Sequence, residues 1–238
     1  MEDTRFLNTS SPYAEQGSAV ARAEFIKKTY LHLALAILGF IGVEALFLNT
    51  PMIVNAAMWF VGGFQWLLLL GGFMFVTNMA ENWARTSTDR SKQYRALALY
   101  VIAEAFIFVP LIYIAMSVTG SGAIVQEAGI LTACLFTGLT AIAFFSNKDF
   151  SFLKSFLTVG FLIAFGLIVL GVIFGFDLGL FFSGAMVMLA AGTILYQTSN
   201  IMRDYHTDQY VAASLGLFAS FMLLFWYILD ILMRFSGD

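Results

Sequence analysis

Seven stretches of about 20 mainly apolar residues follow one another along this chain. A helix of that length crosses the hydrocarbon core of a bilayer, and short links make consecutive helices antiparallel neighbours. The expected spans are residues 29–48, 60–80, 96–118, 128–146, 152–174, 178–198 and 209–232. With 60% apolar and only 11% charged residues, a soluble globule, a nucleic-acid binder and a disordered chain are excluded. The sequence predicts an all-α bundle of seven transmembrane helices over residues 25–238, with the lipid bilayer as its surroundings.

The N-terminal segment 1–24 differs from the rest of the chain. It mixes both signs of charge with Ser, Thr, Asn, Gly and Pro, and it holds no apolar run of signal-peptide length. Such a composition does not supply a buried core, so we expect a flexible, water-exposed tail. No small-residue cleavage site follows the first apolar run, which predicts an uncleaved first span.

The positive charges predict the orientation of the bundle. If all seven spans are counted, eleven of the twelve Lys and Arg residues fall on one side of the membrane and only Arg234 falls on the other. Cytoplasmic loops carry the excess of Lys and Arg. We therefore expect a cytosolic N-terminus and a C-terminus outside. The eleven residues are Arg5, Arg22, Lys27, Lys28, Arg85, Arg90, Lys92, Arg95, Lys148, Lys154 and Arg203.

Small residues recur at helical spacing in the fifth and sixth spans. Gly160 and Gly171 share one stripe of the fifth span, and Gly192 follows Ala185 by seven residues in the sixth. Because lipid gives no hydrophobic drive for helix association, close approach at small residues supplies the packing. The pattern predicts that both helices pack in the interior of the bundle, while general membrane-helix composition is the alternative explanation.

Motifs for catalysis and metal binding are missing from the sequence. It contains no Walker loop, G-x-S-x-G, H-E-x-x-H or C-x-x-C pattern, so we expect no enzyme activity and no cofactor. The single cysteine, Cys134, and the two histidines, His32 and His206, lack the spacing of a zinc site, so no metal is expected. The net charge of −3 gives no reason to expect a nucleic acid as partner.

Glu104 is the ionisable residue that the predicted spans place deepest in the membrane. It follows Arg95 by nine residues, which puts it about 13 Å along the helix from that cationic anchor. Ionisable groups at such depth are costly and are candidates for function. One interpretation is a protonated side chain bonded to backbone that Pro110 frees. The other is a role in proton or cation movement.

Two further polar residues lie at a similar depth. Gln197 precedes Arg203 by six residues, and Ser220 follows the start of the seventh span by eleven. With Glu104 they form our hypothesis of one polar pocket or ion pathway, which depends on helix rotations that depth alone does not fix. Asp230 precedes Arg234 by four residues, the spacing of a helical ion pair, and we expect this pair at the membrane interface.

Several motifs resemble the Bax inhibitor-1 family, which carries the transmembrane Bax-inhibitor motif. They are residues 147–153 (NKDFSFL), 192–201 (GTILYQTSNI) and 214–221 (SLGLFASF), with 25–30 (FIKKTY) fitting the entry to the first span. Their order and the seven spans extend the resemblance over residues 22–235. Within the family, the run Thr198-Ser199-Asn200 resembles the bacterial YccA branch.

The resemblance implies a fold, a partner and a location. It implies seven helices with the seventh span near the centre, and the YccA branch implies an inner-membrane protein that binds the FtsH membrane protease and modulates it. The tail around Arg5, Glu15 and Arg22 is then the candidate contact for this AAA protease. Our first functional hypothesis is such a non-enzymatic regulator in the bacterial inner membrane.

The alternative hypothesis is a leak channel with an altered gate. Other family members are described as pH-sensitive calcium leak channels in which two carboxylates on the last two helices sense protons. Carried over by position, these carboxylates fall on Gln197 and Ser220. An amide and a hydroxyl do not titrate in the physiological range, so a path for Ca2+ or protons in this chain would need Glu104 as its titrating group.

Overall fold

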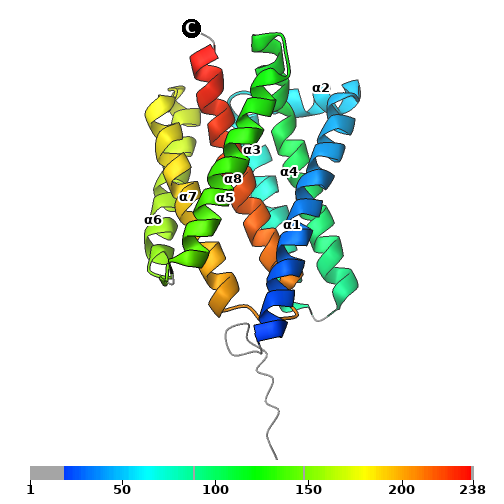
Figure 1. Cartoon of the computed structure of the whole chain (residues 1–238). Coiled ribbons are helices and arrows are strands. Elements are labelled where there is room, and N and C mark those ends of the chain that lie inside the picture. Colours follow the sequence, from blue (N-terminus) through cyan, green and yellow to red (C-terminus); the bar gives the residue numbers. More distant parts are fainter. Residues whose placement is uncertain (1–18, 88, 147, 237–238) are drawn as a thin grey trace, which may run out of the picture.

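The computed structural model describes residues 19–87, 89–146 and 148–236, all of whose regular elements are helices (Figure 1). This part of the chain confirms the all-α prediction. The helices are α1 (Ala19–Leu48), α2 (Pro51–Trp59), α3 (Phe64–Thr86), α4 (Arg90–Thr119), α5 (Ala123–Phe145), α6 (Leu153–Phe174), α7 (Gly179–Arg203) and α8 (Tyr210–Ser236).

Six of these helices, all except α2 and α3, are long and apolar enough to cross a membrane on their own. The short α2 and the longer α3 pass the same test only together, as a pair bent by 110°. Pro51 stands in the first turn of α2, and Gly62 and Gly63 separate the two helices at φ values of 126° and 55° that favour glycine. The seven-span count and the sidedness of the termini therefore remain predictions.

The first expected span and α1 agree at one end and differ at the other. α1 ends at Leu48, as expected, but it begins at Ala19 instead of residue 29. Residues 19–24, which the sequence assigned to a flexible tail, are therefore helical, and residues 1–18 lie outside the described part of the chain. The apolar pattern marks only the part of a helix that crosses the bilayer. Residues 19–28 carry charges and continue the same helix beyond that part.

Alternating helix directions collect the basic segments at one end of the bundle. The beginnings of α1, α4, α6 and α8 and the end of α7 lie at that end, and the end of α8 lies at the opposite one (Figure 1). We call the first the cationic end and the second the far end. Arg234 belongs to the last turn of α8, at the far end.

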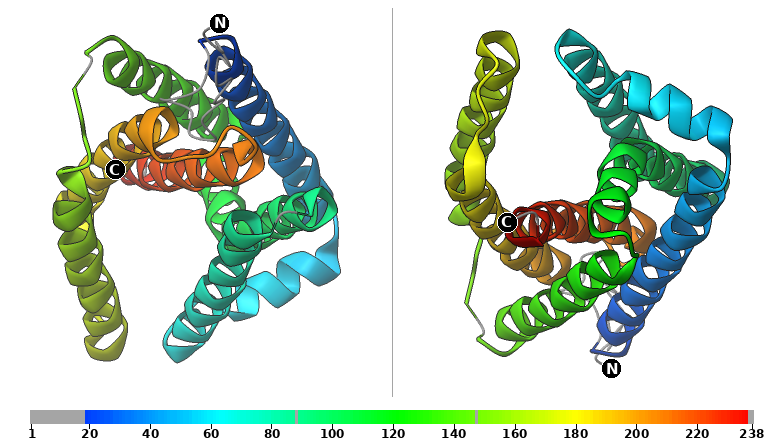
Figure 2. Two further views of the ribbon diagram at one scale, coloured as in Figure 1. Left: turned by 90° about the horizontal axis from the view of Figure 1, so that it is seen from below. Right: turned by 90° about the horizontal axis from the view of Figure 1, so that it is seen from above.

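α8 occupies the centre of the bundle, as the family resemblance implied (Figure 2). It contacts α1, α3, α4, α5 and α7. Its most apolar stretch is 61% buried, whereas that of α6 is 11% buried. Every residue from Tyr210 to Phe218 is buried. The helices around α8 thus shield it from lipid.

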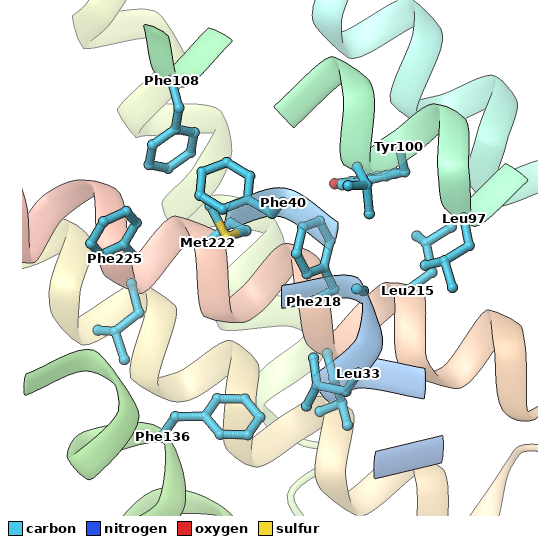
Figure 3. Packing of buried hydrophobic residues seen from close by; sticks show 14 of the residues in the cluster. Leu33, Phe40, Leu97, Tyr100, Phe108, Phe136, Leu215, Phe218, Met222 and Phe225 are labelled. Carbon is cyan, nitrogen blue, oxygen red and sulfur yellow. The ribbon is translucent and has the colours of Figure 1, made fainter. Parts of the chain in front are cut away.

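Aromatic side chains form the core between α1, α4 and α8 (Figure 3). Phe108 lies at its middle, with ring centroids 5.3 Å from Phe40, 5.6 Å from Phe225 and 4.9 Å from Trp226. Phe218 meets Phe40 at 6.5 Å from the side of α8. These contacts fix the rotation of α4 and α8 about their axes and so determine which of their polar residues face one another.

The glycines of α6 and α7 do bring these two helices together. A Cβ at Gly160 would lie 2.6 Å from Leu189 Cδ2, and one at Gly192 would lie 3.1 Å from Leu157 Cδ2. The prediction that both helices lie in the interior is nevertheless wrong for α6, which stands at the periphery (Figure 2). A stripe of small residues identifies a contact with one neighbour, and α6 has its main contact with α7.

Candidate functional site

A single elongated cavity of about 600 Å³ brings Glu104, Gln197 and Ser220 together within the described structure. Its walls come from α3, α4, α6, α7 and α8. Along α8 the lining extends from Gly216 to Arg234, which at 1.5 Å per residue is roughly 27 Å. The hydrocarbon core of a bilayer is about 30 Å thick, so the cavity follows α8 for most of that distance.

Glu104 is the most deeply buried of the acids that line the cavity. Its side chain is 5% exposed, and no group in the described chain forms a hydrogen bond or ion pair with its carboxyl. A bond to the backbone carbonyl that Pro110 frees, one of the two interpretations of the sequence, is therefore not formed. A carboxyl without a protein partner has to be neutral or hydrated in such surroundings.

Gln197 and Ser220 line the same part of the cavity from α7 and α8. The Ser220 hydroxyl donates to the carbonyl of Gly216 at 2.9 Å, so its oxygen can still accept a bond from the cavity. The Gln197 amide rests on Gly216, where a Cβ would lie 3.1 Å from Gln197 Oε1. Gly216 therefore allows the close approach that turns this amide toward α8.

An apolar section follows toward the far end. Trp66, Phe108 and Trp226 line it, with the two indoles 5.9 Å apart and Phe108 4.9 Å from Trp226. Between Ser220 and Asp230 the cavity runs roughly 15 Å along α8. These rings make the wall of the cavity apolar between its two polar parts, and an apolar section of a pore resists the entry of water and ions.

A network of charges lies at the far end. Arg234 donates to both carboxylate oxygens of Asp177, at 2.7 and 3.0 Å, and its Nε donates to Asp230 Oδ2 at 3.0 Å. The Ser183 hydroxyl also donates to Asp230. In the α6–α7 loop, the bonds from the Arg234 guanidinium and the Gly179 backbone lower the pKa of Asp177 to about 2. Sequence spacing indicated Asp230 with Arg234 but gave no signal for Asp177, which is distant in the chain.

Glu44 is the polar residue whose burial the sequence reasoning missed. It lies near the end of α1, yet it is 4% exposed and both carboxyl oxygens lack a hydrogen-bond partner within the described residues. The signal was available, because Glu44 continues the helical stripe that includes Leu33, Ala36 and Phe40 on the buried face of α1.

Of the three remaining candidates, Arg22 is the one that lies within the described residues, at the cationic end. The Arg22 guanidinium, on the first turns of α1, approaches Met202 Sδ at 3.8 Å. Arg5 and Glu15 lie outside the described residues. Within the described ranges, no three His, Cys, Asp or Glu side chains are grouped so that they could hold a metal ion.

The sequence matches known proteins over almost its full length. The family described as inhibitor of apoptosis-promoting Bax1 matches residues 22–237. Bax inhibitor 1 of Schizosaccharomyces pombe is 29% identical over 96% of this chain and 82% of its own length. Protein LIFEGUARD 1 of Arabidopsis thaliana is 28% identical over 90% and 91%, and the uncharacterized protein PA2604 of Pseudomonas aeruginosa is 29% identical over 72% and 75%. The chain belongs to the Bax inhibitor-1 family.

Proposed function

We propose that the cavity along α8 is a proton-linked leak path and that Glu104 is its proton-binding group. The observation that carries this proposal is the buried Glu104 carboxyl, which has no partner in the described chain and lines a cavity with Gln197 and Ser220. A carboxyl in these surroundings can take up and release a proton with small rearrangements of cavity water, whereas an ion-paired carboxyl would have to break its pair first.

The donor set favours protons over Ca2+. Calcium takes six to eight oxygen ligands, commonly with several carboxylates among them. Besides Glu104, the oxygen ligands that line this cavity on the side away from Arg234 are hydroxyls and one amide, from Ser220, Thr193, Tyr100 and Gln197, and one further carboxylate, Glu81 of α3. Two neighbouring carboxylates would provide a coupled proton-sensing pair, but Gln197 and Ser220 stand at those positions. Conduction of Ca2+ is therefore the alternative form of this proposal.

The test is ion flux into liposomes that contain the purified protein. We expect proton flux that rises with the imposed pH gradient and falls at least tenfold in Glu104→Gln. The matched control is Glu127→Gln, because Glu127 is an exposed acid on α5 outside the cavity lining. Flux that is unchanged in Glu104→Gln, or reduced equally in Glu127→Gln, would refute the role of Glu104. Calcium flux without proton flux would support the alternative ion.

Modulation of an FtsH-type membrane protease is the second proposed function, in a bacterial inner membrane. Its support is the resemblance of residues 198–200 to the YccA branch and the beginning of α1 at the cationic end. A cytosolic tail at this position would be accessible to an AAA protease.

Co-purification from native membranes tests this second proposal. We expect the protease to be recovered with the full chain and to be lost, with slower turnover of the protein, when residues 1–18 are deleted. This deletion leaves α1 complete. If the deleted chain retains the protease and the same half-life, the tail is not the contact.

A further inference from the structure

A cluster of cations and aromatic rings surrounds Tyr210 at the cationic end, away from the cavity along α8. The Arg90 guanidinium lies 4.7 Å and the Lys28 ammonium 5.6 Å from the centroid of the Tyr210 ring. The His32 ring is 4.8 Å from the same centroid. Tyr210 is buried and begins α8, whereas the other groups come from α1 and α4. Two cations from different helices thus converge on one ring.

Hydrogen bonds hold the rings of this cluster in place. His32 Nδ1 donates to the carbonyl of Lys28 at 2.7 Å, since a carbonyl can only accept. His32 Nε2 lies 3.0 Å from the Tyr94 hydroxyl, and that hydroxyl lies 3.2 Å from the Tyr210 hydroxyl. The chain of bonds links α1, α4 and α8, so the cluster has a fixed arrangement before any ligand arrives.

The charges of the cluster are not balanced within the described chain. Glu24 pairs with Lys28 at 2.6 Å, but Arg90 has no carboxylate partner among the described residues. The nearby Asp89 accepts the backbone N–H of Ser91 as the cap of α4 and faces Arg95 at 3.9 Å. An anion beside Arg90 and Lys28 would complete the charge balance of the cluster.

An apolar surface continues from the cluster toward the far end. Leu31, Leu35 and Leu38 are 53%, 54% and 63% exposed on α1, and their spacing puts them on the same side of the helix as Lys28. Ile102 is 47% exposed on α4, three turns beyond Arg90. A ligand with an anionic group at the cluster would find apolar surface along both helices, which is the shape and chemistry of a phospholipid.

We propose that Lys28 and Arg90, with His32 and Tyr94 beside them, bind the phosphate of an anionic phospholipid whose acyl chains lie along the exposed faces of α1 and α4. The depth agrees, because the cluster stands where α4 and α8 begin. The apolar faces favour a lipid over free phosphate, because free phosphate has no apolar part that could contact them. This site is independent of the proposed proton path.

The test is binding of a fluorescent phosphatidylglycerol to the full protein in detergent, with phosphatidylcholine as the zwitterionic comparison. The variant Lys28→Gln/Arg90→Gln should bind phosphatidylglycerol roughly 30-fold more weakly, from the usual contribution of each basic residue to binding anionic lipid. The matched control, Lys148→Gln/Lys154→Gln, removes the same charge from the α5–α6 link and the first turn of α6, also at the cationic end, and should change binding less than threefold.

Three further measurements keep the proposal falsifiable. Lys28→Arg/Arg90→Lys keeps both charges and should bind within about threefold of the natural protein; a loss as large as that of the glutamine variant would overturn a charge-based site. Equal weakening in the control would show that only overall charge matters and would overturn it too. Inorganic phosphate at millimolar concentration should not displace the lipid; if it does, the ligand is free phosphate and the lipid assignment is wrong.

Discussion

Replacing Phe108 with alanine should destabilise the bundle by about 2–4 kcal/mol. The ring is 2% exposed and meets Phe40, Phe225 and Trp226. Aromatic pairs of this geometry contribute about 0.5–1.5 kcal/mol each beyond the burial of area, so three pairs sum to roughly 1.5–4.5 kcal/mol. The part of the usual Phe-to-Ala cost that comes from leaving water is smaller in a bilayer, because lipid is itself apolar. Our expectation is therefore about 1 kcal/mol lower than the usual cost of about 3–5 kcal/mol in soluble cores.

The assay is the free energy of unfolding in mixed micelles, followed by far-ultraviolet circular dichroism as the fraction of SDS increases. Phe75→Ala is the matched control, because that ring is 71% exposed on α3 and faces away from the core; it should change stability by less than about 0.5 kcal/mol. If Phe108→Ala unfolds within about 0.5 kcal/mol of the natural protein, or if Phe75→Ala loses as much, the assignment of packing energy to this cluster is wrong.

Three further predictions concern the far end and the middle of the cavity. The Asp177–Arg234 pair should contribute its full stability above the usual carboxyl pKa of 3.8 and lose it as the pH falls through about 2. The free energy of unfolding of the natural protein should therefore decline over that pH window. In Arg234→Gln it should change less with pH. At pH 7 the same substitution should cost only about 1 kcal/mol, because the pair is partly exposed; a loss above 3 kcal/mol by thermal or SDS unfolding would contradict this. Gly216→Ala should crowd the Gln197 amide by a few tenths of an ångström. A double-mutant cycle with Gln197→Ala should give a coupling free energy of about 1 kcal/mol. If the stability changes of the two single variants simply add, the two residues do not touch.

The depth of polar residues could be predicted from the sequence, but their partners could not. Distance along a helix from a basic residue put Glu104, Gln197 and Ser220 at similar levels, and all three line one cavity. Whether they face each other depends on helix rotation, which the ring contacts of Phe108 and Phe218 determine through residues far apart in sequence. No local pattern contains that information.

Errors arose where a local signal had more than one structural outcome. The glycine stripe of α6 correctly indicated close contact with α7 but not which helix lies inside, since small residues report one interface and not the rest of the circumference. Asp177 was passed over because its partner, Arg234, lies on another helix. The burial of Glu44 could have been predicted from its place on the buried stripe of α1.

The central position of α8 sets an order of assembly. α8 is synthesised after the other seven helices, yet it is the helix that they surround (Figure 2). Until it leaves the ribosome, the inner faces of α1, α4, α5 and α7 have no partner at the centre and must meet lipid, water or one another. Completion of the bundle therefore requires α8 to enter between helices that precede it in the chain.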